Sequence, residues 1–306
     1  MGMSNLVSGE AQERHVPLSG LSHYGNIAKR LWPGFVPAAS MAIIITTTIA
    51  ALLADFVSPH DPIKQSLVDS RLQPSWGRDG STEFLLGTDF FGRDILTRLI
   101  YGARISLSIG GLVILVGATV GTVVGITAGF FGGFVDGILM RIVDIILSLP
   151  LILVAIVLVV VLGASTSNVI IVVTLLVWPR FARVIRSEAL SIRQQDFIIL
   201  AEIAGASKIR IMMRHMLPNV VPTILVIATL QVGQVIVLES SLSFLGVGIP
   251  PPDPSWGVMV ADGRGTLRSA WWISFFPGLS ILLVVLSFNQ VGDWLRDRLD
   301  PRLQQL

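Results

Sequence analysis

The 306-residue chain is 52% hydrophobic and only 14% charged, and its mean hydropathy is +0.75. Soluble domains carry about 25% charged residues, so this composition excludes an ordinary water-soluble domain and predicts long segments buried in lipid. The net charge is +2 and no Lys/Arg cluster is interleaved with aromatic residues, which argues against nucleic acid as a partner. The absence of cysteine excludes disulfides, thiolate metal sites and cysteine nucleophiles.

The N-terminal segment is polar and carries Glu10, Glu13 and Arg14. It lacks the apolar core of a cleavable signal peptide. We therefore expect residues 1–31 to form a cytoplasmic tail. The first transmembrane helix and an external loop are expected in residues 32–103.

Stretches without Asp, Glu, Lys or Arg define the predicted spans, because one such charge at mid-bilayer costs about 2.5–3.5 kcal/mol. Residues 31–54, 215–238 and 269–292 are free of these charges and long enough to cross about 30 Å of hydrocarbon. Residues 105–135 form a fourth such stretch, with a glycine-rich exit.

A fifth charge-free stretch, residues 145–179, would be about 52 Å long as one helix, which exceeds what a bilayer needs. We expect it to fold back at the polar break in residues 163–168 and to supply two spans. The chain is therefore predicted to be an all-α polytopic membrane protein with six transmembrane helices.

The distribution of Lys and Arg predicts the orientation of these spans. With the N-terminus inside, most of the 22 basic residues fall on the cytoplasmic side, among them Arg180, Arg183 and Arg186. The basic residues of the external segment 58–104 are offset by nearby acidic residues. We expect both termini in the cytoplasm, including a C-terminal tail of residues 294–306.

Glycine recurs at every fourth position in the second predicted span, at Gly117, Gly121, Gly125 and Gly129. Such a stripe lets another helix backbone approach closely, so it predicts helix packing. Lining of a substrate path is the alternative interpretation.

Two short amphipathic helices are predicted between the fourth and fifth spans, in residues 186–218. Apolar residues with helical spacing are Phe197, Leu200, Ala201 and Ala204, and, after an interruption at Gly205, Ile209, Met212, Met213 and Met216. The glycine permits a positive φ and close approach of another backbone. The spacing fits both a helix pair lying on the membrane surface and one that docks into a groove of a partner.

Glu239 ends the fifth predicted span and is followed by three serines within four residues. An ionisable group at this depth usually faces protein or water. A structural hydrogen-bond anchor is one interpretation, and direct contact with a substrate, as in a gate, is the other.

Motifs of catalysis, metal binding and phosphate binding are missing from the sequence. The histidines form no HExxH pair, and there is no GxxxxGK[ST] phosphate loop. We assign no catalytic or metal-binding residue and expect no cofactor in this chain. Energy for any active process must then come from another polypeptide.

Three segments resemble a known family. They are LGTDFFGRDILTRLIYGARISLSIG (residues 86–110), ESSLSFLGVGIPPPDPSWGVMVADGR (residues 239–264) and SFNQVGDWLRDRLDPRL (residues 287–303). They are similar to the second-span entry, the loop after the fifth span and the C-terminal signature of the C-type permease subunits of dipeptide and oligopeptide ABC importers.

The segment 186–218 resembles the coupling motif of that family, EAA, three residues, G, nine residues, I, one residue, LP. The resemblance implies an ATPase-coupling loop that contains Ala201, Gly205, Ala206, Leu217 and Pro218. The chain departs from the motif at the glutamate, first alanine and isoleucine positions, which hold Ile199, Leu200 and His215.

The resemblance implies a type I ABC importer permease fold in residues 104–293 and a location in the bacterial inner membrane. It also implies a homologous permease subunit, two cytoplasmic ATP-binding subunits that bind ATP and Mg²⁺, and an external solute-binding protein. Short peptides are the expected cargo, with nickel chelates, glutathione or another small solute as the alternative. An ion-coupled secondary transporter and an intramembrane enzyme are the rival classes, and the spans carry little of the ionisable chemistry that either needs.

Overall fold

The computed structural model describes the backbone of residues 21–299 and the side chains of residues 35–299. This part of the chain is built from helices and contains no β-strand, which confirms the predicted all-α class. The long helices are α1 (Leu21–Leu52), α3 (Ile95–Phe131), α4 (Gly133–Ser148), α5 (Leu151–Leu162), α6 (Thr166–Arg193), α9 (Leu217–Phe244) and α11 (Trp272–Leu299). The shorter helices are α2 (Ala54–Val57), α7 (Asp196–Ile203), α8 (Lys208–Ile211) and α10 (Trp256–Gly263), with 3-10 turns at Leu67–Asp69 and Arg264–Thr266 and a π-helical segment at Met212–Met216.

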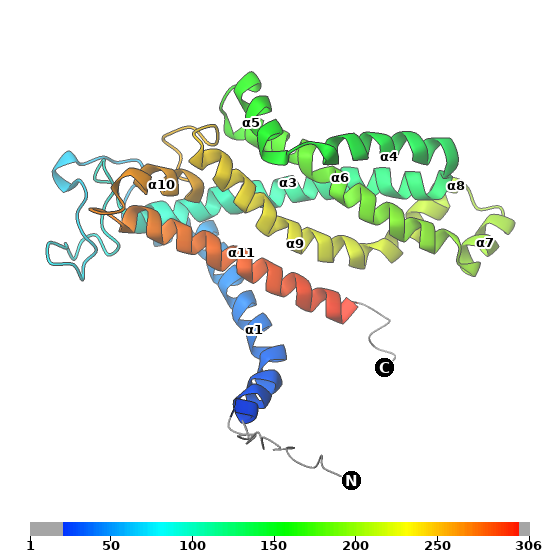
Figure 1. The fold of residues 1–306 in the computed structure, drawn as a ribbon, viewed down its shortest axis with the longest axis horizontal. Coiled ribbons are helices and arrows are strands. Elements are labelled where there is room, and N and C mark those ends of the chain that lie inside the picture. Colours follow the sequence, from blue (N-terminus) through cyan, green and yellow to red (C-terminus); the bar gives the residue numbers. More distant parts are fainter. Residues whose placement is uncertain (1–20, 300–306) are drawn as a thin grey trace, which may run out of the picture.

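Helices α3, α4, α6, α9 and α11 lie lengthwise in one elongated body, from which α5 projects (Figure 1). The segment between α2 and α3 lies with α10 at one end of the body, and α7 and α8 lie at the other end (Figure 1). Helix α1 diverges from the body towards its N-terminal end (Figure 1). Its C-terminal part packs through Ile43 and Ala51 against residues of α3, α9 and α11.

Five helical segments within residues 21–299 are long and apolar enough to cross a membrane, and α4 and α5 together make a sixth if their bent pair is one span. The axes of α4 and α5 differ by 91°. Helix α5 ends at Leu162, Gly163 follows with φ of 88°, and the Ser165 hydroxyl caps α6. This confirms the predicted fold-back within residues 163–168.

Several helix boundaries differ from the predicted ones. Helix α1 already begins at Leu21, inside the segment expected as a tail, and residues 1–20 of that tail lie outside the described part. Helix α11 continues to Leu299, past the expected start of the C-terminal tail, and residues 300–306 are likewise not described. The third span was expected to start near residue 145, but α4 begins at Gly133, directly after Gly132 breaks α3 with φ of 63°.

Arg180, Arg183 and Arg186 do not lie in a loop, as the charge count suggested, but in the second half of α6. Helix α6 continues to Arg193 alongside α3. Arg183 forms an ion pair with Asp144, and Arg186 forms one with Asp136, both carboxylates belonging to α4. Arg183 and Arg186 thus lie on the surface of the helical body opposite acidic partners on α4, which no local sequence pattern indicated.

The glycine stripe of α3 faces α6. A β-carbon added to Gly121, Gly125 or Gly129 would lie 2.6 Å from the Trp178 carbonyl oxygen, 2.8 Å from the Ala182 carbonyl oxygen and 2.6 Å from the Ala189 Cβ, respectively. Gly117 has an ordinary contact, 3.6 Å to a methyl group of Val177. Because lipid tails are as apolar as the helix surfaces, close van der Waals contact of this kind replaces the hydrophobic drive of a soluble core.

We expect Gly125→Ala to lower the apparent Tm and the folded yield of the protein purified in detergent. Its added β-carbon would meet two α6 backbone atoms, the carbonyl oxygen of Ala182 at 2.8 Å and the nitrogen of Arg186 at 2.9 Å. Overpacking of this kind costs about 1–3 kcal/mol. Gly111→Ala is the matched control, since a β-carbon there meets no atom within 4 Å. Equal Tm values for the two variants would contradict the packing role.

Candidate functional site

The predicted coupling segment contains a helix that ends in a Schellman motif. Helix α7 has Ala204 as its C-cap, and Gly205 follows with φ of 77°. The backbone N–H of Gly205 donates to the carbonyl of Glu202, and that of Ala206 donates to the carbonyl of Ala201, both at 3.0 Å. A residue in the left-handed region is required for this pair of bonds, so the motif explains why glycine stands at this junction.

The second predicted amphipathic helix is not a separate element. Ser207 caps α8, and α8 runs through the π-helical segment Met212–Met216 directly into α9. The 37 residues Lys208–Phe244 therefore form one helical unit that is long and apolar enough to span a membrane. The spacing indicated a helix correctly, but spacing alone could not indicate that the helix continues into the following span.

The coupling segment is fixed to the body by a small hydrophobic cluster. Ile198, Ile211 and Met216 are almost completely buried and contact the ends of α3 and α6 through residues such as Phe130 and Ile185. Ala201, Ala206 and Leu217 pack against the same cluster and are only partly buried. Three of the five residues assigned to the coupling loop are therefore brought together, while Gly205 and Pro218 are exposed.

The predicted apolar face of α7 points outward instead of into the body. Ile198 is the residue that anchors the helix, whereas Phe197, Leu200 and Ala204 are exposed. The large apolar side chains exposed around the Gly205 junction are Phe197, Ile199, Leu200, Ile203, Ile209 and Met213. Contiguous exposed apolar surface of this kind marks a contact with another protein or with lipid. Ile199 and Leu200, which depart from the family motif, belong to this surface.

Glu239 lies near the opposite end of the same helical unit and is 1% exposed. Its carboxylate accepts hydrogen bonds from the hydroxyls of Ser243 at 2.8 Å, Ser255 at 3.0 Å and Ser240 at 3.5 Å. Ser255 is also the N-cap of α10. The carboxylate thus connects the end of α9 to the start of α10 and closes the loop between them.

A buried charge cluster on the same end of the body was not recognised from the sequence. The Asp89 carboxylate lies 2.6 Å from Nε of Arg93 and 3.6 Å from Nε of Arg98, and Asp262 of α10 lies 3.6 Å and 3.9 Å from the same two guanidinium groups. Burial raises the pKa of Asp262, and Arg98 and Arg93 oppose this rise. The cluster ties the start of α3 to α10, and the only signal for it was the balance of acids and bases in the segment before α3.

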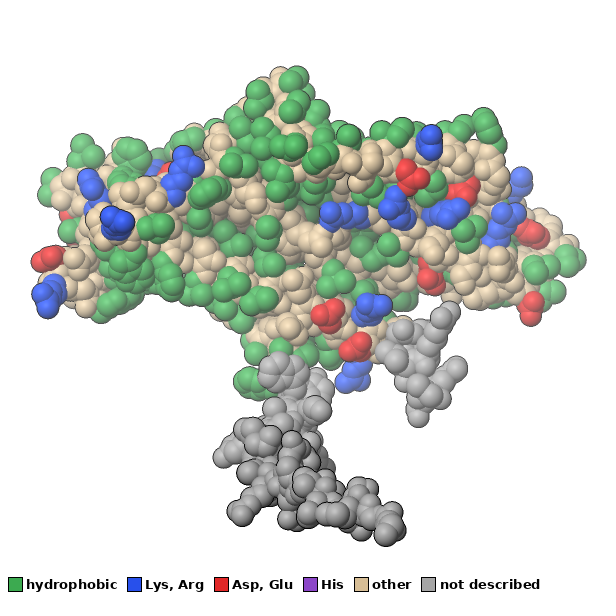
Figure 2. All heavy atoms as spheres, viewed as in Figure 1, with side chains coloured by type: hydrophobic (Ala, Val, Ile, Leu, Met, Phe, Trp, Pro, Cys, Tyr) green, Lys and Arg blue, Asp and Glu red, His purple; other side chains and the backbone are tan. Residues whose placement is uncertain are grey.

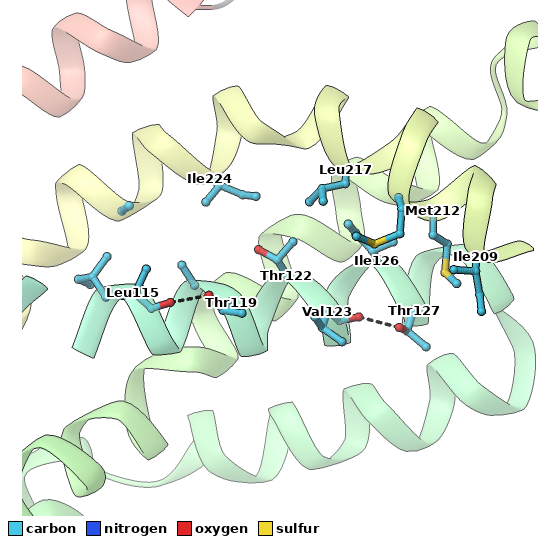
Figure 3. A pocket seen from close by; sticks show the side chains of 14 residues that line it. Leu115, Thr119, Thr122, Val123, Ile126, Thr127, Ile209, Met212, Leu217 and Ile224 are labelled. Atoms are coloured by element: carbon cyan, nitrogen blue, oxygen red, sulfur yellow. Dashed lines mark hydrogen bonds between the residues drawn. The ribbon is translucent and has the colours of Figure 1, made fainter. Parts of the chain in front are cut away.

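An apolar cavity of about 610 Å³ lies between α3 and the α8–α9 unit (Figure 3). Thr119 and Thr127 line it, but their hydroxyls donate to backbone carbonyls of α3 at 2.7 and 2.6 Å. The Thr122 hydroxyl has no hydrogen-bond partner among the described residues. The remaining lining is apolar and includes Ile126 and Met212, so the cavity suits apolar groups. The side chains described in residues 35–299 include no group of three His, Asp or Glu residues that could hold a metal ion.

The sequence of the chain matches a family of known proteins. The model of the binding-protein-dependent transport system inner membrane component matches residues 121–305. The dipeptide transport system permease protein DppC of Escherichia coli (strain K12) is 39% identical over 303 residues, which cover 99% of this chain and 100% of that protein. A putative peptide transport system permease protein of Brucella suis biovar 1 (strain 1330) is 43% identical over 264 residues, covering 86% of this chain and 87% of that protein. The di/tripeptide transport system permease protein DppC of Pseudomonas aeruginosa (strain UCBPP-PA14) is 37% identical, covering 92% and 94%.

A solved structure of the MetNI methionine ABC transporter, in an inward-facing conformation, matches with a TM-score of 0.56. It is 18% identical, and the match covers 67% of this chain and 98% of that chain. The likeness shows that the fold is that of an ABC transporter chain. With a family model that matches more than half of its length and relatives aligned over nearly all of it, the chain belongs to the inner-membrane components of binding-protein-dependent transport systems.

Proposed function

We propose that the chain is the permease subunit of an ATP-driven importer and that, with a second homologous permease subunit, it forms the translocation path for short peptides. Two cytoplasmic ATP-binding subunits hold ATP and Mg²⁺, and an external solute-binding protein delivers the cargo. The relatives named as dipeptide, di/tripeptide and peptide permeases support the choice of cargo.

The observation that carries the mechanism is the continuity of the helical unit Lys208–Phe244. At about 1.5 Å per residue it is roughly 55 Å long. One end adjoins the Gly205 junction and its exposed apolar surface, and the other end carries Glu239. A displacement imposed on α7 by an ATP-binding subunit is therefore transmitted to the loop before α10 by a single element.

Two features allow this element to bend while it transmits motion. The π-helical segment Met212–Met216 interrupts the regular hydrogen bonding near one end, and Pro222 lies inside the helix two turns later. Both are recognised sites of helix bending. Ile198 meanwhile connects α7 with the ends of α3 and α6, so the same push also moves the glycine-packed pair.

The position of the coupling segment supports the proposed orientation. The C-terminal end of α11 points towards the end of the body that carries α7 and α8 (Figure 1). With that end facing the ATP-binding subunits, the C-terminal tail is cytoplasmic, and the segment before α3 and helix α10 face the external binding protein. The Lys/Arg distribution supports an N-terminus on the same, cytoplasmic side of the bacterial inner membrane.

Cysteine labelling tests the orientation, because the chain has no native cysteine. Asp79 and Gln194 are both exposed. We expect Asp79→Cys to react with a membrane-impermeant maleimide in intact cells, and Gln194→Cys to react only after permeabilisation. Labelling of Gln194→Cys in intact cells would show that the orientation is inverted.

Gly205→Leu should impair communication between the ATP-binding subunits and the translocation path. A leucine at φ of 77° is strained by about 1–2 kcal/mol, and its side chain would project from the exposed junction. We expect peptide uptake and transport-stimulated ATP hydrolysis to fall at least about tenfold, while the amount of assembled complex stays near wild type. Gly205→Asn is the matched control for conformation, since asparagine tolerates this region. Wild-type uptake and ATP hydrolysis in Gly205→Leu would refute the coupling role.

Competition experiments test the cargo. In cells that express the complete system, we expect unlabelled di- to pentapeptides to compete with a labelled dipeptide for uptake. The permease subunit alone should bind none of them tightly, because a translocation path must release its cargo. Failure of every peptide length, together with competition by a nickel chelate or glutathione, would replace the peptide assignment but leave the permease assignment standing.

A further inference from the structure

Arg180 lies near the middle of the membrane-spanning body. It is close to the centre of α6, and its neighbour Trp178 packs between Gly117 and Gly121 of α3. Those two glycines lie near the middle of the charge-free stretch 105–135. Counted along these two helices, Arg180 lies near the middle of the helical body, beside the charge-free stretch of α3 that is expected to cross the hydrocarbon layer.

Arg180 differs from the other two arginines of this helix in its partners. Arg183 and Arg186 form ion pairs with carboxylates of α4. In the described part of the chain no carboxylate lies within ion-pair distance of Arg180. Its Nη1 donates to the side-chain oxygens of Gln231, at 3.3 Å, and of Gln234.

The hydrogen-bonding capacity of Arg180 is only partly used. A guanidinium group carries five N–H donors, and both of its bonds come from Nη1. Within residues 35–299, no acceptor is found for Nη2 or Nε. Gln231 is 6% exposed, and its amide nitrogen also lacks a partner in this part of the structure. Donors without acceptors therefore gather around a positive charge at this depth.

A groove of about 540 Å³ between α6, α9 and α11 comes within one helical turn of this position. Val184 and Ile227, which line it, lie one helical turn from Arg180 and Gln231. Further residues of its lining are polar or charged, among them Glu188, Ser191 and Arg296. Figure 2 shows basic side chains in a row from the middle of the body towards the end that carries α7 and α8, with acidic side chains beside them and hydrophobic ones around them.

We propose that Arg180, oriented by Gln231 and Gln234, binds the carboxylate of the cargo on the translocation path. A charge inside a membrane protein is costly and is found facing a partner, a cavity or a substrate path. The C-terminal carboxylate is ionised at pH 7 in every peptide, whatever its side chains. A single arginine can pair with it through two parallel N–H···O bonds. The inference rests on the proposed import of peptides.

The first experiment measures the charge at this position without requiring transport. The assembled complex is placed in lipid nanodiscs, and Gln234→Cys gives this subunit a single thiol, which lies beside Arg180. Modification of the thiol is followed as an increase in the mass of this subunit. The measured quantity is the reaction rate of the anionic reagent methanethiosulfonate ethylsulfonate divided by that of its cationic trimethylammonium analogue. We expect this ratio to be at least about threefold higher with Arg180 present than in the variant that also carries Arg180→Gln. A dipeptide at millimolar concentration should slow the reaction, and its C-terminal amide should not.

The second experiment measures transport in proteoliposomes with the binding protein saturated by each cargo. We expect Arg180→Gln to lower the uptake rate of a free dipeptide about tenfold, and Arg180→Lys to keep much of the wild-type uptake rate. Uptake of the dipeptide amide should be the same in both variants as in wild type. Two outcomes would overturn the proposal and indicate an ion pair with the second permease subunit. One is an equal loss of uptake for the free and the amidated dipeptide, and the other is a thiol at residue 234 that neither reagent reaches. A preference for the anionic reagent without protection by peptides would also overturn it and would point to a cargo other than peptides.

Discussion

The rest of the structure depends on the backbone contact between α3 and α6. In lipid, two apolar helices gain nothing from hiding their surfaces from water, so a stable pair needs close contact along its length. Gly121, Gly125 and Gly129 provide it, since at each position the α6 chain occupies the space that a β-carbon would need. This pair fixes the depth of every group on α6, and the coupling segment is attached to its end through Ile198.

Helix α9 contributes the second constraint, because it joins the two ends of the body in one element. The Schellman motif at Gly205 sets the angle between α7 and α8, and α8 is the start of the α9 unit. At the far end, the three hydroxyls on Glu239 hold the loop that leads to α10, and the Asp89–Arg93–Arg98–Asp262 cluster holds α10 against α3. The Gly205 junction and the contacts of Glu239 are therefore joined by one continuous helical segment.

The sequence was sufficient for features that depend on local chemistry. The charge-free stretches, the turn after Gly163 and the glycine at the coupling junction follow from solvation and backbone conformation, and the structure has all three. Features that depend on distant partners could not be predicted. The inward face of α7 is set by Ile198, which packs in one cluster with the ends of α3 and α6. Arg183 and Arg186 lie on the surface of the helical body, paired with Asp144 and Asp136 of α4. A charge count assigns such arginines to a loop, since it treats every charge as unpaired.

Glu239 and Arg180 differ in how far side chains of the same subunit satisfy their hydrogen bonds. Glu239 is fully enclosed, and serine hydroxyls of its own chain approach both of its oxygens, so its interactions are complete within the subunit. Arg180 is only partly buried, and one of its nitrogens donates hydrogen bonds to two neutral side-chain oxygens. Neutral amide oxygens offset part of the desolvation of a guanidinium but leave its charge uncompensated. Among the described residues Arg180 therefore has no anionic partner, and a carboxylate on the proposed cargo would supply one.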